Sequence, residues 1–316
     1  MGCLADIQEQ FFSALLNGLA IGSVYALIAL GVGMVYGVLR LINFAHGEVF
    51  MVGTFGALGV LVAFAGRAGG SSIQTIVVLV LAALGAMLAS GVAAVLLEVV
   101  AYRPLRHFGA PRHASMISGM GASIVLQELF GLRFGRGMIP YPEILPQTTL
   151  VEIGHARLTN KMLLVFVATL VMLAVLEYFV SRTRLGRGMR ALAEDPTGAA
   201  LMGVNASRII TVTFLVGGLC AGLAGFLYSI YFTKTRYLIG FLPGLKGLTA
   251  SILGGVGNFR GAVLGGFLLG LVESFGSVCL PSELRDVIAF GALILVLLFR
   301  PSGILGEVAP SRRRSP

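Results

Sequence analysis

Long stretches without a charged residue recur along this chain, and each is about as long as a lipid bilayer is thick. Residues 10–39, 71–97 and 209–233 contain no Asp, Glu, Lys, Arg or His. A helix needs roughly 20 apolar residues to cross the hydrocarbon core. Because water disfavours so much exposed apolar surface and lipid accepts it, the pattern predicts an integral membrane protein.

Roughly nine apolar segments follow from segment length and from the positions of the charges. The seventh is short and rich in glycine, which predicts a half-helix or a re-entrant segment. We therefore expect an all-α fold, in which residues 1–316 form one polytopic transmembrane helical bundle of roughly eight or nine spans. The predicted segments are 12–39, 49–66, 73–100, 115–132, 162–180, 209–231, 245–257, 262–279 and 286–300.

Basic residues between these segments set the predicted orientation, because cytoplasmic loops carry an excess of Lys and Arg. Segments 102–113 and 182–208 each hold several arginines, and residues 312–314 are three more. We place all three regions, and with them the C-terminus, in the cytoplasm, and the N-terminus outside. Residues 133–161 contain several prolines and mixed charges, and we expect them to form an external loop on which a soluble partner can land.

Composition supports a membrane protein and argues against nucleic-acid binding. Hydrophobic residues make up 57% and charged residues 12% of the chain, against about 25% charged in a soluble domain. The mean hydropathy is +0.93, and 316 residues are too few for so apolar a soluble core. The net charge of +9 reflects arginines at the expected cytoplasmic ends, so lipid and not nucleic acid is the expected partner.

Nothing in the sequence predicts a metal site or a catalytic residue. Cys3, Cys220 and Cys279 lack the spacing of metal ligands, and His46 has no second ligand near it in the sequence. We find no pattern of a nucleophile beside a base. We therefore expect neither catalytic chemistry nor a bound metal.

A polar cluster interrupts the apolar sequence between the first two predicted spans. Asn43, His46 and Glu48 stand together there, and a charge at mid-helix is costly in lipid. The cluster therefore belongs either to a broken helix that lines a translocation pathway or gate, or to an interfacial loop among lipid headgroups. Gly254 and Gly255 are candidates for the same pathway, because bare backbone could approach a substrate there; tight packing is the simpler explanation for them.

Four acidic residues lie near span ends or within apolar segments: Glu98, Glu128, Glu177 and Glu273. Glu98 stands near a predicted cytoplasmic span end, so we expect it to be solvated. Glu273 lies deeper in its segment. For Glu273 we favour a structural ion pair, with an arginine or backbone donors of a neighbouring helix, over a transport site.

Glycines are abundant, at 44 residues, although glycine is costly in a soluble helix. In a membrane helix, glycines four residues apart let two backbones approach closely. We therefore predict tight helix crossings at four pairs of glycines with this spacing. They are Gly18 and Gly22, Gly218 and Gly222, Gly261 and Gly265, and Gly266 and Gly270.

The segment 182–208 is longer than a simple connector requires. Helical propensity over 187–193 is broken by Pro196 and resumes over 199–202, after which Gly203 can end the helix. We expect short helices across the membrane face, with an apolar knob and an arginine rim that dock a partner; a solvated basic loop is the alternative. The predicted docking residues are Arg187, Arg190, Ala191, Glu194, Asp195, Ala199, Ala200, Met202 and Gly203.

Four stretches, in order along the chain, resemble the branched-chain amino-acid ABC transporter permeases. Residues 18–55 (GLAIGSVYALIALGVGMVYGVLRLINFAHGEVFMVGTF) are similar to the first part of those permeases, and residues 101–106 (AYRPLR) also fit. Residues 190–209 (RALAEDPTGAALMGVNASRI) are similar to their cytoplasmic loop, and residues 244–273 (GLKGLTASILGGVGNFRGAVLGGFLLGLVE) to their C-terminal signature. The likeness is closest to the high-affinity subunit without a long N-terminal extension, and it is weakest over 136–160.

The resemblance implies a permease subunit that moves branched-chain amino acids across a bacterial inner membrane by alternating access. The implied partners are a second homologous permease, two ABC ATPase subunits and a periplasmic or lipid-anchored binding protein. Residues 182–208 would be the coupling loop, a shortened version of the Glu-Ala-Ala loop of ABC importers. Because this chain has no Walker motif, ATP and Mg²⁺ would lie on the ATPases, and this subunit would be neither an enzyme nor a cofactor carrier.

Two other functions stay open from the sequence. A permease of the same superfamily could carry urea, short amides, sugars or nucleosides, and the ligand held by a co-encoded binding protein would distinguish these cargoes. An ion-driven carrier would need intramembrane carboxylates, for which Glu273 is the candidate. Transport without any ATPase would favour that second function.

Overall fold

Helices dominate the computed structural model, which describes residues 3–64, 72–153, 156–281 and 284–306. Within these ranges, seven helices are long and apolar enough to cross a membrane. The prediction of an all-α polytopic bundle is confirmed, while the arginines at 312–314 lie outside the described residues. The seven are α1 (Cys3–Leu39), α2 (His46–Phe64), α3 (Ser72–Leu97), α5 (Arg112–Phe134), α6 (Asn160–Arg182), α9 (Ala206–Phe232) and α11 (Phe259–Cys279).

Shorter elements complete the fold. The predicted segments 245–257 and 286–300 form helices of 14 and 15 residues, and 15 residues of helix reach only about 22 Å. A π-helix (Glu98–Tyr102) joins α3 to the next short helix, so that the span runs on to His107. The other elements are α4 (Arg103–His107), α7 (Arg184–Glu194), α8 (Pro196–Leu201), α10 (Phe241–Gly254), α12 (Arg285–Phe299), and the strands β1 (Ile139–Pro140), β2 (Thr149–Ile153), β3 (Ala156–Thr159) and β4 (Lys234–Thr235).

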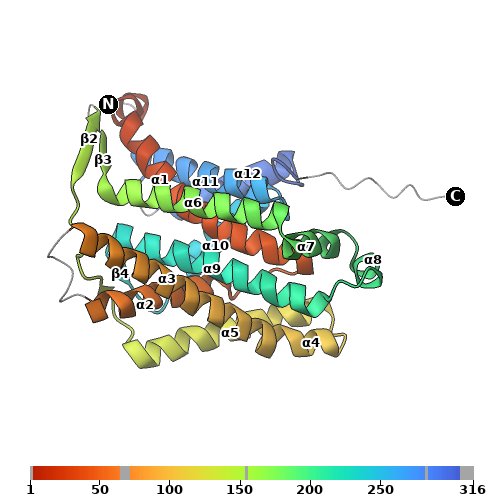
Figure 1. The fold of residues 1–316 in the computed structure, drawn as a ribbon. Coiled ribbons are helices and arrows are strands. Elements are labelled where there is room, and N and C mark those ends of the chain that lie inside the picture. The colour runs from red at the N-terminus through yellow and green to blue at the C-terminus, as the bar shows by residue number, and fades with distance from the viewer. Residues whose placement is uncertain (1–2, 65–71, 154–155, 282–283, 307–316) are drawn as a thin grey trace.

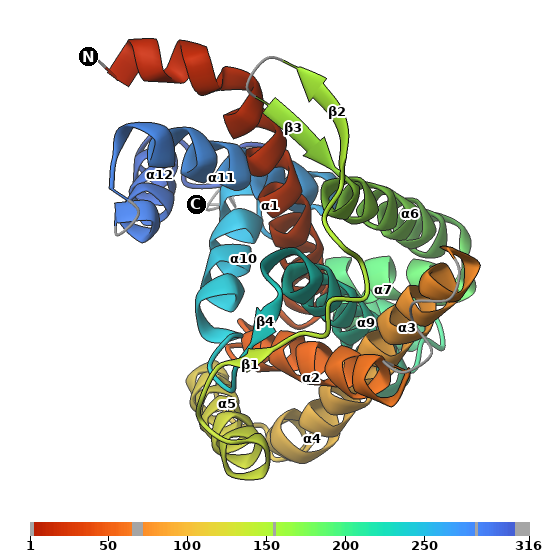
Figure 2. The same ribbon diagram turned by 90° about the vertical axis from the view of Figure 1, so that its left-hand side faces the viewer.

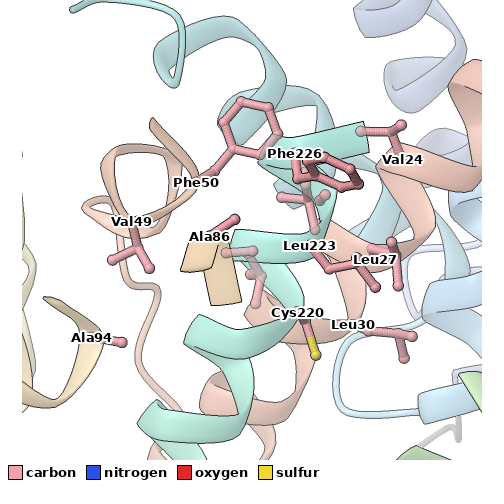
Figure 3. Close-up of a cluster of buried hydrophobic side chains, with 14 of the residues drawn as sticks. Val24, Leu27, Leu30, Val49, Phe50, Ala86, Ala94, Cys220, Leu223 and Phe226 are labelled. Atoms are coloured by element: carbon pink, nitrogen blue, oxygen red, sulfur yellow. The ribbon is translucent and has the colours of Figure 1, made fainter. Parts of the chain in front are cut away.

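The helices differ in how much of their surface the fold covers. In the most apolar window of α1, 83% of the residues are buried, and in that of α9 78%, against 22% for α5 and for α6. Side chains of α1, α2 and α9 meet around Phe50, Cys220 and Phe226 (Figure 3). Because few residues of α5 and α6 are buried, these helices form the outside of the bundle, where lipid or a partner subunit can cover them.

The two ends of the bundle carry different structures. The β2–β3 hairpin and the start of α1 lie at one end, and α7 and α8 lie at the other (Figure 1). Viewed from the hairpin end, α1, α9 and α10 run near the centre, with α3, α5, α6 and α12 around them (Figure 2). The region 133–161 and the segment 182–208 therefore occupy opposite ends of the molecule.

The eight glycines predicted to lie at helix crossings all do so. A Cβ added at Gly18 would lie 3.0 Å from the Leu271 Cα, and one at Gly270 would overlap the Gly22 Cα. Main chains can approach this closely because at least one of the two helices has no side chain at the point of contact. The other six glycines make similar approaches: Gly22 to Phe267, Gly266 to Ala26, Gly261 to Gly254, Gly265 to Ala250, and both Gly218 and Gly222 to residues 86–94 of α3.

The end of the molecule that carries the hairpin is fixed to the bundle by main-chain and side-chain contacts. Strand β1 pairs antiparallel with β4, and β2 with β3. Tyr141, which follows β1, is buried and donates its hydroxyl hydrogen to the Thr54 carbonyl oxygen of α2. Burial raises the pKa of the Tyr141 hydroxyl above its ordinary value, so this group stays protonated and keeps donating.

Candidate functional site

A cavity of about 780 Å³ lies between α2, α5 and α10, and the polar cluster of the sequence lines it. Asn43, His46 and Glu48 reach it from the start of α2 and the loop before it. Ser123 and Gln127 reach it from α5. The rest of the lining is mostly apolar, apart from one guanidinium, and consists of Val32, Phe44, Gly47, Met120, Ile124, Arg236, Leu238, Phe241, Leu242, Gly244, Leu245 and Leu248.

The polar cluster lies inside the bundle and not at its surface. The residue exposures of Asn43, His46 and Glu48 are 6%, 3% and 1%. A Cβ added at Gly31 of α1 would lie 2.6 Å from His46 Nε2. Since Gly31 precedes Leu39, the end of α1, by roughly 12 Å of helix, α2 starts well inside the bundle. This burial supports the broken-helix alternative over the headgroup loop.

Asn43 is held in place by hydrogen bonds. Its Oδ1 accepts from the Ala45 main-chain N–H and from the Tyr102 hydroxyl, both at 3.0 Å. Tyr102 belongs to the π-helix after α3, and its hydroxyl packs against Gly119 of α5. The π-helix, a conformation common at functional sites, thus joins α3, α5 and the loop before α2 at one point of the cavity wall.

Only one of the two Glu48 carboxylate oxygens accepts hydrogen bonds from neighbouring side chains. Its Oε1 accepts from Gln127 Nε2 at 2.6 Å and from Ser123 Oγ at 3.4 Å. Within the described part of the chain, Oε2 has no hydrogen-bond partner, and neither has His46 Nε2. A buried polar atom without a partner is costly, so the site can gain stability from a bound group.

The two other pathway candidates are not at this cavity. Gly254 packs against the Gly261 carbonyl of α11, and Gly255 lies against residues 305–306, with a φ of 113° that favours glycine. Neither residue lines the cavity with Glu48. Gly254 therefore packs α10 against α11, and Gly255 packs against the segment that follows α12.

The segment 182–208 folds into two short helices, as the sequence predicts. Asp195 accepts a hydrogen bond from the Thr197 N–H at 3.0 Å and so caps α8, which Pro196 begins. Gly203 follows with a φ of 81°, typical of a residue just past a helix end. The segment 182–208 therefore has a defined structure and presents a defined surface at the end of the bundle.

The exposed side of that surface differs from the sequence prediction at one residue. Ala199 is 5% exposed and packs against the bundle, so it is not part of an exposed knob. Ala200 is exposed, and Leu201 and Met202 are 84% and 87% exposed. The apolar knob is thus Ala200–Met202, with Leu201 as a residue that the sequence prediction omitted. Among the other predicted docking residues, Arg187, Arg190, Glu194, Asp195 and Gly203 are exposed and Ala191 is half-buried.

Two arginines connect α7 to neighbouring elements. Arg190 donates to the carbonyl oxygens of Val180 and Ser181 at the end of α6. Arg40, just after α1, donates to the Ala193 carbonyl oxygen at 3.0 Å. Carbonyls at a helix end carry partial negative charge, which suits a guanidinium. Through Arg40, α7 is linked to the loop that carries Asn43.

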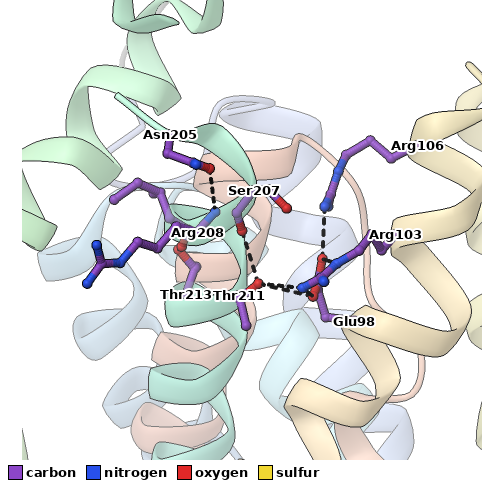
Figure 4. Close-up of polar contacts among 9 residues, drawn as sticks. Glu98, Arg103, Arg106, Asn205, Ser207, Arg208, Thr211 and Thr213 are labelled. Atoms are coloured by element: carbon purple, nitrogen blue, oxygen red, sulfur yellow. Dashed lines mark hydrogen bonds and ion pairs between the residues drawn. The ribbon is translucent and has the colours of Figure 1, made fainter. Parts of the chain in front are cut away.

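A buried carboxylate joins α3 to α9 near the α7–α8 end. Glu98 is 0% exposed and forms ion pairs with Arg103 and Arg106 at 2.7 and 2.8 Å (Figure 4). Thr211 of α9 donates to the same carboxylate at 3.1 Å. The expectation that Glu98 is solvated is wrong.

A second buried charge cluster fixes α10. Glu273 accepts from Lys246 Nζ at 2.9 Å and from the Tyr25 hydroxyl at 2.9 Å. Lys246 also pairs with Asp286 of α12 at 2.8 Å. The structural ion pair expected for Glu273 is present, but its partner is a lysine of α10 and not an arginine.

Comparison with known proteins gives consistent results over nearly the whole chain. Residues 14–297 match the family model described as branched-chain amino acid transport system / permease component. The high-affinity branched-chain amino acid transport system permease protein BraD of Pseudomonas aeruginosa is 40% identical over 302 residues, which cover 94% of this chain and 96% of that protein. The corresponding protein LivH of Escherichia coli K12 is 38% identical over 310 residues, with 95% and 98% covered.

One solved structure shares the fold. An inward-facing metal-chelate type ABC transporter superposes with a TM-score of 0.50 and 16% identity, over 93% of this chain and 90% of that one. At this identity, the likeness concerns the arrangement of helices alone.

Proposed function

The chain belongs to the family of branched-chain amino acid transport permeases, and from this premise we propose that it is the membrane-spanning subunit of an ATP-driven importer for branched-chain amino acids. The observation that carries the proposal is the similarity to BraD and LivH over nearly the full length of all three chains. The mostly apolar cavity beside α2 supports it, because transfer of an aliphatic side chain from water into such a lining is favourable.

The proposed assembly divides the work among several subunits. Two ABC ATPases would bind ATP and Mg²⁺ and hydrolyse ATP, whereas this chain would bind no cofactor and catalyse no reaction. A second, homologous permease would complete the pathway, and a periplasmic or lipid-anchored protein would deliver the amino acid. Closure of the ATPases would switch the side to which the pathway opens.

The sidedness of this multi-pass membrane protein follows from the same proposal. The α7–α8 end carries several arginines and would face the cytoplasm of a bacterial cell, and the hairpin end would face outward. The C-terminus would then be cytoplasmic and the N-terminus external. The delivering protein would land on the hairpin end, near residues 133–161.

We assign the ATPase contact to α7 and α8. Leu201 and Met202 are large apolar side chains that remain almost fully exposed at the end of the molecule. Apolar anchors surrounded by charged groups are typical of tight protein contacts, and Arg187 is exposed on the preceding helix α7.

A charge placed in this contact tests the assignment. We expect Ala200→Arg to abolish co-purification of the ATPase subunits and ATP-driven leucine uptake, because an unpaired guanidinium would be buried in an apolar interface. Leu150→Arg, in the hairpin at the other end, is the matched control and should leave ATPase co-purification unchanged. If Ala200→Arg assembles and transports like the unaltered protein, the docking assignment is wrong.

A further inference from the structure

The cavity beside α2 holds two opposite charges that do not pair with each other. Among the described residues that line it, Glu48 is the carboxylate and Arg236 the guanidinium, and no ion pair joins the two side chains there. Elsewhere in the bundle, buried carboxylates are paired, as Glu98 and Glu273 are. The carboxylate in this cavity is unpaired, unlike those of Glu98 and Glu273, which indicates a site for a ligand.

Glu48 offers one free acceptor to such a ligand. Gln127 and Ser123 orient the carboxylate by donating to Oε1, and Oε2 has no donor within the described residues. Both orienting side chains also line the cavity, so the carboxylate lies in its wall. A buried carboxylate is stabilised by a cation that also donates hydrogen bonds, and an alkylammonium group does both.

Arg236 lines the same cavity from the segment between β4 and α10. It directly follows β4, which pairs with β1 at the hairpin end of the molecule. Arg236 also lines a second cavity of about 190 Å³, together with Lys234 and Met138. A carboxylate that arrives from the hairpin end meets this basic region first, and a guanidinium can bind it through two parallel hydrogen bonds.

Apolar side chains make up most of the rest of the cavity wall. They come from α1, α5 and α10. An aliphatic group can pack against them without displacing a polar group. The main ones are Val32, Met120, Ile124, Phe241, Leu245 and Leu248.

We propose that this cavity binds the amino acid itself as a zwitterion, with its ammonium group at Glu48, its carboxylate at Arg236 and its aliphatic side chain against the apolar wall. The proposal rests on the proposed function and adds a binding site within the permease to that of the delivering protein. Asn43, braced by Tyr102, and His46 would form the floor on the side of the α7–α8 end.

Equilibrium binding to the assembled importer tests this site. The complex is purified without the delivering protein, and binding of radiolabelled leucine is measured in competition with two analogues. Leucinamide keeps the ammonium and lacks the carboxylate, whereas 4-methylpentanoate keeps the carboxylate and lacks the ammonium. The variants are Glu48→Gln and Arg236→Gln, and Glu128→Gln, in an exposed pair with Arg136, is the control.

We expect each cavity variant to weaken leucine binding by roughly 10- to 100-fold, the worth of one hydrogen bond to a charged group. Arg236→Gln should leave leucinamide binding unchanged, and Glu48→Gln should leave 4-methylpentanoate binding unchanged, because each analogue lacks the group that the lost charge contacts. Glu128→Gln should bind all three ligands as the unaltered complex does. Retained co-purification with the ATPases shows that a variant is folded.

Three results would overturn the proposal: no leucine binding by the unaltered complex, unchanged leucine affinity in both cavity variants, or equal weakening of all three ligands in each variant. The last would mark Glu48 and Arg236 as structural residues. ATP-driven uptake by the unaltered complex is measured in parallel. If leucine is taken up while the cavity variants bind it normally, this site is wrong and the proposed function stands; if no branched-chain amino acid is taken up, the proposed function fails.

Discussion

At the scale of single residues, buried charges in this protein are neutralised by partners that the local sequence does not reveal. Arg103 stands five positions after Glu98, a spacing that does not bring two side chains together on an α-helix. The π-helix at Glu98–Tyr102 has wider turns, with bonds from residue i to i+5, and it carries Arg103 over the carboxylate. Because a π-helix has no clear sequence signal, the sequence could place Glu98 near a span end but could not predict its burial.

This pairing predicts that Glu98→Gln destabilises the protein. The substitution leaves Arg103 and Arg106 without their anion in a half-buried site, which should cost about 1–3 kcal/mol. Glu128→Gln removes a carboxylate from the exposed Arg136 pair and should cost about 0–1 kcal/mol. Thermal unfolding of the purified variants in the same detergent compares the two. Equal midpoints for both variants would show that the Glu98 cluster adds no stability.

At the scale of helices, close main-chain contact holds the centre of the bundle together. Helices α1 and α11 meet through Gly18, Gly22, Gly266 and Gly270, and lipid supplies little hydrophobic drive for such pairing. Van der Waals contact between backbones must therefore provide much of the stability. Any side chain inserted at the crossing separates the two helices along their length.

Gly270→Ala should accordingly destabilise the bundle by about 1–3 kcal/mol, because its Cβ would overlap the Gly22 main chain. Gly59 of α2 has no atom within 4 Å of an added Cβ, so Gly59→Ala is the matched control. That control should be neutral or stabilising by up to about 1 kcal/mol, as alanine favours helix. Denaturation midpoints of the two variants measure the difference, and a Gly270→Ala protein as stable as the control would refute the tight crossing.

Helices were more predictable from the sequence than the site. The length of an apolar segment predicts a membrane helix, and all nine predicted segments correspond to helices. Pro196 and Gly203 likewise predict where α8 begins and ends. The sequence does not predict the depth of Glu48, because this depth depends on His46 packing against Gly31 of another helix. The pairing of Lys246 with Glu273 likewise arises only when α10 folds back beside α11.

At the scale of the whole molecule, the fold separates the two ends at which we propose that partners dock. The hairpin end presents β2 and β3, and the other end presents the Ala200–Met202 knob (Figure 1). Arg40 links α7 to the loop that carries Asn43, which gives a physical connection from the knob to the cavity. Movement of α7 could thus alter the cavity wall without contact between an ATPase and the amino acid.

Chemical labelling in intact cells tests the orientation of these two ends. We expect a membrane-impermeant maleimide to label Leu150→Cys from outside the cell and Met202→Cys only in inside-out vesicles, because both side chains are exposed at opposite ends. The protein without either substitution controls for its native cysteines. The reverse pattern would invert the orientation and would remove α8 from the reach of a cytoplasmic ATPase.

The most direct test of the account is leucine uptake into proteoliposomes that contain the purified permease with its partner subunits. We predict that leucine accumulates only when ATP is present on the ATPase side and the loaded delivering protein is present on the hairpin side, and that a preparation without the ATPases takes up none. Accumulation of leucine by this chain without ATPases, driven by a sodium or proton gradient, would contradict the account.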